Sequence, residues 1–407
     1  MQKNWKNIFF QNINYEELFK SNNKNMYMYL IKRILKEFIN TENDSIKESV
    51  YSTKNDTWYI YDSNIYKIIF NESKTYHLYF SKIDGVTWRY GKDPTSEEPK
   101  FCDLGPEILD LEISVNGCPT VGGKSCRFCY KNNTNAPATN MTFDVFKKIV
   151  DSMPKCLYSI AFGITGVQTN PDFLEMLEYC RDNDIVPNYT LSGADLDEHM
   201  LRESCRLCGA VAVSCYSTNK NLCYDTIKRF HDYKKDMHVN MHIVLSEEPE
   251  QLNHVWDVLN DIKNKKIIGL RNIVFLRIKP VGRAKSMDCK IHKETYKKVV
   301  KFCLDNKIGF GFDSCSAKTI SNILKEMGNG EMCESCEPCE SSKFSAYINV
   351  KGEYWNCSFC ERDDRITAVD VLKYNNFHDA WVLPEIQKMR NINCESSCPM
   401  FDLDSVD

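Results

Sequence analysis

Three cysteines close together in the sequence are the residues best suited to do chemistry. Cys118, Cys126 and Cys129 lie in a short segment that also contains glycines and follows an apolar, strand-like stretch. Glycines let a backbone fold tightly around sulfur ligands, so these thiolates can surround one metal centre. A structural zinc site takes four ligands, whereas a cubane 4Fe-4S cluster held by three cysteines leaves one iron open. The spacing therefore favours an iron–sulfur centre, and zinc with a distant fourth ligand is the alternative.

A second group of cysteines lies near the C-terminal end. The chain has 20 cysteines, and its first residues lack the layout of a secretory signal. We therefore expect a reducing, cytoplasmic location, where clustered cysteines bind metal more often than they form disulfides. The candidates for one or two further metal centres, with zinc or free thiols as the alternative, are Cys315, Cys333, Cys336, Cys339, Cys357, Cys360, Cys394 and Cys398.

The elements that must position the first three cysteines alternate between strand and helix. Apolar strand-like segments and segments of helical periodicity follow one another between residues 108 and 310, which predicts an α/β fold with a parallel sheet covered by helices. The expected strands span 108–114, 157–165, 186–192, 210–216, 238–246 and 273–279. The expected helices span 141–153, 171–184, 194–207, 221–233, 249–263 and 293–306.

Alternate residues of these strands differ in character, and successive strand residues point to opposite faces. One face carries large apolar side chains and the other carries small or polar ones. In the last strand this rule assigns Val274, Leu276 and Ile278 to the apolar face and Arg277 and Lys279 to the polar face. A closed barrel usually fills its interior with Val, Ile and Leu. The polar interior therefore favours an open, partial (β/α)6 TIM-like barrel, with a flat doubly wound sheet as the alternative.

The chain divides into three expected domains. Residues 1–107 form an α+β unit, with a helix over 15–40 and strands over 57–61, 65–70, 75–80 and 85–90. The segment 91–99 contains two prolines and several charges, which is typical of a linker. Residues 108–310 form the barrel, and residues 311–407 form a cysteine-rich domain.

The loop with the first three cysteines resembles the cluster-binding motif of the radical S-adenosylmethionine superfamily. The family's usual motif is Cys-x3-Cys-x-aromatic-Cys. Here Phe128 supplies the aromatic between Cys126 and Cys129, but seven residues instead of three separate Cys118 from Cys126. The resemblance implies that the three cysteines hold a 4Fe-4S cluster whose open iron binds S-adenosylmethionine, which makes them the catalytic ligands.

Segments at the following strand ends resemble the family's cofactor contacts. Thr165, Gly166, Val167 and Gln168 are similar to the segment that receives the methionine amino group mainly through its backbone, although the family has Gly and Glu in place of Val and Gln. The remaining implied contacts, on or after the third to sixth strands, are Ser192, Ser214, Asn240, Lys279, Gly282 and Arg283.

The C-terminal region is similar to the SPASM and twitch domains, which carry auxiliary iron–sulfur clusters. Two of its cysteines flank a glycine at the family's spacing, while the full SPASM run of cysteines is incomplete. The resemblance implies one auxiliary 4Fe-4S cluster, held by Cys339, Cys357 and Cys398 with Cys333 or Cys315 as the fourth ligand. A second cluster from the remaining cysteines is left open.

The function implied by the resemblance is reductive cleavage of S-adenosylmethionine, followed by hydrogen abstraction from a substrate by the 5′-deoxyadenosyl radical. We expect a peptide or protein side chain as the substrate, since SPASM-like members mostly modify peptides and the N-terminal unit could bind a leader segment. The alternatives are a dehydrogenase or rearrangement enzyme acting on a small molecule or nucleotide, and a non-catalytic iron–sulfur electron carrier. A one-electron reductant such as flavodoxin or ferredoxin is the implied partner.

Charge and hydropathy make two other classes of partner unexpected. The formal net charge of −4 gives no electrostatic argument for binding nucleic acid. No apolar run is long enough to cross a membrane. We therefore expect neither nucleic acid nor membrane as a partner, and the oligomeric state stays open.

Overall fold

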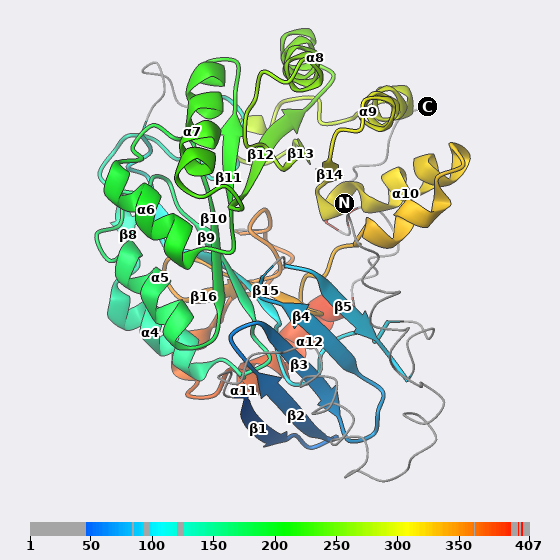
Figure 1. Ribbon diagram of the computed structural model, residues 1–407. Helices are drawn as coiled ribbons and strands as arrows, with labels where there is room; N and C mark the ends of the chain where they lie inside the picture. The colour runs from blue at the N-terminus through cyan, green and yellow to red at the C-terminus, as the bar shows by residue number, and fades with distance from the viewer. Residues whose placement is uncertain are drawn as a thin grey trace. The chain divides into compact units, whose positions relative to one another are not determined.

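The computed structural model describes residues 46–83, 85–92, 98–119, 126–361, 363–391, 398 and 400–401. These residues fall into two compact units, of which the first ends at residue 99 and the second contains nearly all that follows (Figure 1). The expected helix over 15–40 lies outside the described residues.

The first unit is an antiparallel sheet in which sequence neighbours pair. Its strands are β1 Lys47–Ser52, β2 Thr57–Asp62, β3 Tyr66–Asn71, β4 His77–Ser81 and β5 Thr87–Tyr90. The four strands predicted over 57–61, 65–70, 75–80 and 85–90 are confirmed as β2 to β5. Strand β1 was not expected, because it is an edge strand whose residues are mostly exposed and polar, so burial leaves little pattern in its sequence.

The second unit contains a ten-stranded sheet in the order β14-β13-β12-β11-β10-β9-β6-β15-β16-β17. All pairs from β14 to β15 are parallel, and the last two pairs are antiparallel. The six predicted strands are confirmed as β6 Ile108–Glu112, β9 Ser159–Gly163, β10 Val186–Leu191, β11 Ala210–Cys215, β12 His238–Leu245 and β13 Asn272–Arg277. The chain is therefore an α/β protein with a central, mostly parallel sheet.

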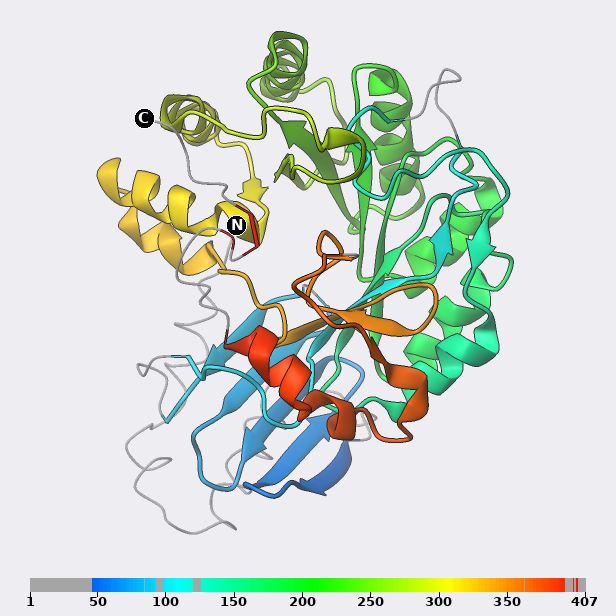
Figure 2. The same ribbon diagram turned by 180° about the vertical axis from the view of Figure 1, so that it is seen from behind.

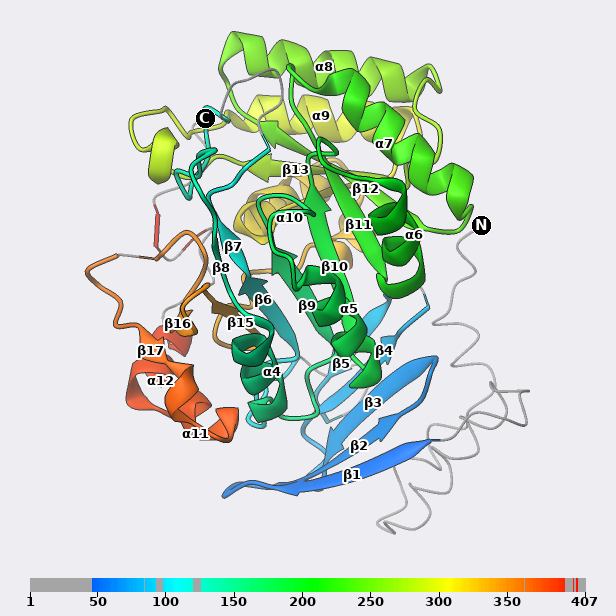
Figure 3. The ribbon, with the colours of Figure 1, turned by 90° about the vertical axis from the view of Figure 1, so that its left-hand side faces the viewer.

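Helices cover the outer face of this sheet (Figure 3). All six predicted helices are confirmed: α4 Phe143–Ser152, α5 Phe173–Asp182, α6 Glu198–Leu207, α7 Lys220–Tyr233, α8 Pro249–Lys263 and α9 Lys293–Asp305. Side-chain caps help to fix where two of them begin. The Thr142 hydroxyl accepts a hydrogen bond from the Val145 N–H, and the Asp197 carboxylate accepts one from the Met200 N–H.

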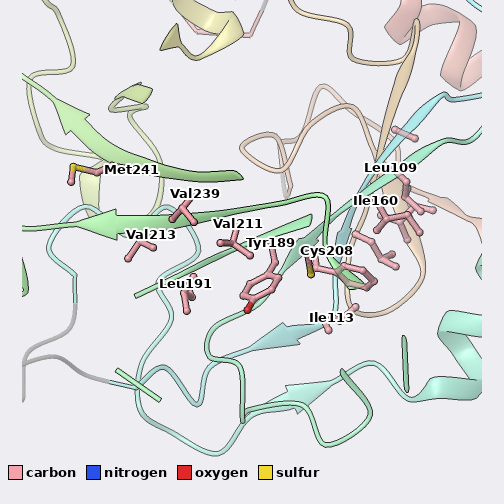
Figure 4. Close-up of a cluster of buried hydrophobic side chains, with 14 of the residues drawn as sticks. Leu109, Ile113, Ile160, Tyr189, Leu191, Cys208, Val211, Val213, Val239 and Met241 are labelled. Carbon is pink, nitrogen blue, oxygen red and sulfur yellow. The ribbon is translucent and has the colours of Figure 1, made fainter. Parts of the chain in front are cut away.

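The core lies between the sheet and these helices. Apolar strand residues such as Leu109, Ile160, Val211 and Met241 are fully or almost fully buried (Figure 4). The opposite, inner face carries the small and polar residues. The predicted two-faced character of the sheet is therefore confirmed for the strands from β6 to β12.

Strand β13 is the exception, and the predicted faces are wrong there. The register with β12 pairs Ile273 with Met241 and Phe275 with Ile243, so these residues lie on the helix-covered face together with the buried Arg277. Val274 and Leu276, which we assigned to that face, instead lie on the inner face. Both sets of alternate residues in β13 are apolar, so the sequence pattern did not distinguish them and the register decided.

The C-terminal segment contributes strands to both ends of the sheet. Strand β14 Phe310–Phe312 spans the predicted domain boundary at residue 310 and pairs with β13. At the other end, β15 Ser345–Ile348 pairs with β6 and continues into β16 Glu353–Trp355 and β17 Val369–Asp370 (Figure 2). The helices of this segment are α10 Ala317–Glu326, α11 Phe377–Trp381 and α12 Pro384–Arg390.

Within the described part of the chain, none of the helices combines the length and the apolar character needed to span a bilayer.

Candidate active site

The first cysteine loop, which we define as residues 116–134, leaves the sheet directly after β6. Its ends are joined by the two-residue strands β7 Ser114–Val115 and β8 Thr139–Asn140. Asn116 also holds the two ends of the loop together, because its side-chain oxygen accepts a hydrogen bond from the Thr134 N–H at 3.1 Å. The Cys118 N–H donates to the Thr134 carbonyl at 3.0 Å. Cys118 is thereby fixed at the carboxyl end of β6, while residues 120–125 lie outside the described residues.

The three predicted cysteines come together in this loop. Cys126 and Cys129 share a turn in which the Cys129 N–H donates to the Cys126 carbonyl at 3.3 Å. The pKa of Cys126 is raised to about 11, mainly by burial; the nearby Cys129 and Cys118 thiols contribute to the rise, and the Phe128 N–H and the Arg283 charge oppose it. Burial is also the main cause of the raised pKa of Cys118. A cationic centre among these sulfurs would offset the cost of their charge.

The turn after β13 contains Gly282 and Arg283, and it contacts the first cysteine loop through hydrogen bonds to the loop's carbonyl oxygens. The Arg283 side chain donates from Nε to the Cys126 carbonyl at 2.7 Å and from Nη2 to the Asn133 carbonyl at 2.8 Å. Its backbone N–H donates to the Cys129 carbonyl at 3.1 Å. Gly282 has a φ of +59°, and a Cβ there would collide with the carbonyl oxygens of Cys129 and Tyr130. The family resemblance implied that both residues contact the cofactor, and their contacts described here are to the loop that carries the cysteines.

The turn after β9 packs against the same loop. A Cβ on Gly166 would collide with the Asp195 carboxylate and lie 2.9 Å from Pro119, which follows Cys118. Asp195 accepts the Gln168 N–H at 3.0 Å, and its charge contributes to the raised pKa of Cys118. Asp195 was not predicted. The only sequence signal was its place directly after the third strand, where loop residues of a parallel sheet gather.

The other three residues predicted after β9 as cofactor contacts are Thr165, Val167 and Gln168, and each has a different environment. The Val167 side chain is buried in the core, so only its backbone is available to a ligand. The Gln168 side chain donates to Asp197 at 3.0 Å. The Thr165 N–H donates to the Ser114 hydroxyl at 2.9 Å, which joins the ends of two neighbouring strands.

Asn219 joins the next two strand ends. Its side-chain nitrogen donates to the carbonyls of Ser214 at 2.9 Å and Ser192 at 3.3 Å. Both serines were predicted as cofactor contacts, and they lie at the same edge of the sheet as the cysteine loop. The Phe128 ring reaches this edge as well, with its centroid 5.7 Å from that of Tyr216. Asn240 lies further down the inner face and accepts from Asn272 at 3.3 Å.

Lys279 turns towards the C-terminal cysteines. It is buried, forms an ion pair with Asp313, and lies 4.6 Å from the centre of the Phe359 ring. The charges of Asp313, Cys315 and Cys357 raise its pKa against the opposing effect of burial.

Four C-terminal cysteines gather beside Lys279. Cys315 and Cys398 share a hydrogen bond that lowers the pKa of Cys398 and raises that of Cys315. Cys357 and Cys360 form a second hydrogen-bonded pair, and the raised pKa of Cys357 includes the effect of the nearby Cys398. We refer to Cys315, Cys357, Cys360 and Cys398 as the C-terminal thiol group.

The remaining predicted ligands are Cys333, Cys336, Cys339 and Cys394. Cys333 donates to the Ser321 carbonyl at 3.3 Å, and Cys336 follows it in the same turn. Cys339 lies near Tyr354, whose pKa it raises slightly together with Cys357. Cys394 is outside the described residues. Among the residues that are described, no three His, Cys, Asp or Glu side chains are close enough to hold a single metal ion. A cubane cluster is larger and takes one thiolate at each iron, so its ligands lie further apart.

Two side-chain contacts connect the first cysteine loop with the C-terminal thiol group. Lys131 forms ion pairs with Glu112 of β6 at 2.8 Å and with Glu361, which follows Cys360. The rings of Tyr130 and Phe359 lie 4.5 Å apart. Because these contacts are partly buried, they fix the two groups of cysteines relative to each other.

Comparison with known proteins supports the fold. None of the protein families compared matches the sequence, and no curated protein matches it. Among solved structures, SuiB of Streptococcus suis bound to S-adenosylmethionine is 12% identical, with 73% of this chain and 69% of SuiB covered and a TM-score of 0.53. SuiB bound to the precursor peptide SuiA is 11% identical, with 78% and 88% covered and a TM-score of 0.56.

A second solved protein has a similar fold. The structure of anSMEcpe with bound AdoMet is 13% identical, covers 70% of this chain and 82% of that one, and has a TM-score of 0.51. SuiB and anSMEcpe both bind S-adenosylmethionine in these structures. The likeness confirms, at the level of the fold, the resemblance found in the sequence.

Proposed function

We propose that this protein is a radical S-adenosylmethionine enzyme that modifies a peptide. The observation that carries the proposal is the meeting of Cys118, Cys126 and Cys129 in one loop at the carboxyl end of a parallel sheet. That is the edge where α/β enzymes place their chemistry. In this proposal the curved sheet acts as a partial (β/α)6 barrel and the C-terminal segment as a SPASM/twitch-like domain.

The three cysteines would hold a 4Fe-4S cluster. Their fit is supported by their partial burial, which raises the pKa values of Cys118 and Cys126, because a cationic centre would offset this effect. When bound, the cluster and S-adenosylmethionine would supply the electron and the 5′-deoxyadenosyl radical that abstracts hydrogen from the substrate. Arg283 and Gly282 would hold the cysteine loop in place. Gly166, Gln168 and the serine-bearing strand ends would form the surface on which the cofactor lies.

The C-terminal thiol group would hold one auxiliary 4Fe-4S cluster. Compared with the ligands implied by the sequence, this proposal keeps Cys357, Cys398 and Cys315 and puts Cys360 in the place of Cys339. A one-electron reductant such as flavodoxin or ferredoxin would deliver electrons, and the N-terminal unit would recognise the peptide. The structures of SuiB with its precursor peptide and of anSMEcpe with the Kp18Cys peptide favour a peptide over a small molecule.

The test is formation of 5′-deoxyadenosine by the full-length protein after anaerobic reconstitution with iron and sulfide. We expect 5′-deoxyadenosine when dithionite and S-adenosylmethionine are supplied, and a higher yield when a pool of synthetic peptides is added. Pools of sugars and nucleotides should leave the yield unchanged. No 5′-deoxyadenosine from protein that contains iron would overturn the proposal, and stimulation by a small-molecule pool alone would replace the peptide with that substrate.

Removing the Arg283 side chain should make the first cysteine loop less stable without unfolding the protein. Arg283→Ala removes the side-chain hydrogen bonds to the carbonyls of Cys126 and Asn133, at a cost of about 2 kcal/mol borne by this loop. We expect less iron in the protein and a rate of 5′-deoxyadenosine formation about tenfold lower. Arg229 is a matched control, since it donates to the Leu196 carbonyl at 3.1 Å and lies outside the loop. Equal iron and equal rates in Arg283→Ala and Arg229→Ala would contradict this role of Arg283.

A further inference from the structure

Asp195, in the loop after β10, holds the turn that follows the neighbouring strand β9. Its carboxylate accepts hydrogen bonds from two successive backbone groups of that turn, the Gln168 N–H at 3.0 Å and the Val167 N–H. Hydrogen bonds from backbone N–H groups to a carboxylate are stronger than those between neutral groups. Asp195 therefore fixes the orientation of the peptide units on both sides of Val167.

Three segments meet at this carboxylate. A Cβ added to Gly166 would lie 2.3 Å from Oδ2 of Asp195 and 2.9 Å from the Pro119 ring, so a residue without a side chain is needed between them. Pro119 belongs to the first cysteine loop. The turn contacts that loop again through Thr169, whose hydroxyl donates to the Gly117 carbonyl at 3.3 Å. These contacts fix the turn against the loop that carries the proposed cluster ligands.

The carbonyl groups of the same two peptide units face away from Asp195. A trans peptide unit is planar, so its N–H and its C=O point in opposite directions. The Gly166 carbonyl, opposite the Val167 N–H, accepts the Thr169 N–H at 3.2 Å. The Val167 carbonyl, opposite the Gln168 N–H, accepts no hydrogen bond from any described residue. It is an acceptor held in a fixed direction at the carboxyl edge of the sheet.

We infer that Asp195 is a positioning residue for S-adenosylmethionine, because it orients the Val167 carbonyl to accept a hydrogen bond from the ammonium group of the cofactor. The inference rests on the proposed function, in which the turn after β9 forms part of the cofactor surface. An ammonium group only donates hydrogen bonds, so a carbonyl oxygen in a fixed direction suits it. Asp195 acts through the backbone of the turn and does not itself contact the cofactor.

The test measures the Kd of S-adenosylmethionine by equilibrium dialysis with the reconstituted full-length protein, without dithionite. Asp195→Ala releases both N–H groups, and we expect its Kd to be about thirtyfold higher. Asp195→Asn keeps an acceptor oxygen, so its Kd should stay within about threefold of the unaltered value. Asp370 is a matched control, since it accepts the Leu372 N–H at 3.1 Å, and Asp370→Ala should leave the Kd unchanged. An unchanged Kd in Asp195→Ala, or equally weak binding by Asp195→Asn, would overturn the inference.

A second comparison uses the analogue of S-adenosylmethionine that lacks the α-amino group. The unaltered protein should bind this analogue about thirtyfold more weakly than the cofactor, whereas Asp195→Ala should bind the two within about threefold of each other, because both changes remove the same interaction. The iron content of Asp195→Ala should equal that of the unaltered protein, since Arg283 and Asn116 still hold the cysteine loop. Additive effects of the two changes, or loss of iron, would overturn the inference by giving Asp195 a purely structural role. Failure of the proposed function would appear separately, as absence of 5′-deoxyadenosine from the unaltered protein.

Discussion

Replacing Cys118, Cys126 and Cys129 together by alanine should abolish cleavage of S-adenosylmethionine while leaving the protein folded. The three thiols meet in one loop after β6 and, as proposed, are the ligands of the catalytic cluster. With all three removed, nothing in the loop can bind the iron that the reaction requires. We expect the rate of 5′-deoxyadenosine formation under dithionite to fall to less than about a thousandth of the unaltered rate.

The control for this variant is a triple substitution of cysteines that pack in the core. Cys180, Cys205 and Cys303 are almost completely buried on three helices that cover the sheet. Their replacement by alanine should cost some stability, but the rate should stay within about threefold of the unaltered protein. Normal 5′-deoxyadenosine formation by the Cys118/Cys126/Cys129 variant would show that the catalytic cluster lies elsewhere.

Replacing the C-terminal thiol group should remove a separate portion of the iron. Cys315, Cys357, Cys360 and Cys398 form two hydrogen-bonded pairs beside Lys279, with Cys398 near Cys357. Four thiolates can complete the coordination of one 4Fe-4S cluster. The quadruple alanine variant should therefore lose about four iron atoms for each chain. The reconstituted protein is analysed for iron and sulfide, and its visible absorbance should fall accordingly.

The matched comparison uses the three other described C-terminal cysteines. Cys333, Cys336 and Cys339 were candidates from the sequence, and Cys333 and Cys336 share one turn in which the Cys333 thiol donates to the Ser321 carbonyl. Their replacement by alanine should leave the iron content unchanged if one auxiliary cluster is present. Loss of about four irons in this variant, with full iron in the quadruple variant, would restore the ligands first expected from the sequence.

Local sequence patterns predicted the framework of the second unit well. Each of the six predicted strands and six predicted helices was found within one residue of its expected range, because an apolar face on an element is sufficient to reveal it. The cysteine loop was predictable for a similar reason, since Cys126 and Cys129 share a single turn. The C-terminal strands β14 and β15 escaped prediction. They are short, and they exist because β13 and β6 offer them an edge to pair with.

The sequence by itself determined which residues alternate, where the helices begin and which thiols can share a turn, because these depend on neighbours within a few positions. The tertiary structure alone decided the contacts between distant segments. Register with β12, not alternation, set the faces of β13. Packing turned Lys279 to Asp313 and brought Arg283 to the carbonyls of Cys126 and Asn133. The pairing of β9 with β10 also placed the Asp195 carboxylate beside the turn after β9, since a carboxylate's neighbours in space depend on strands far away in the sequence.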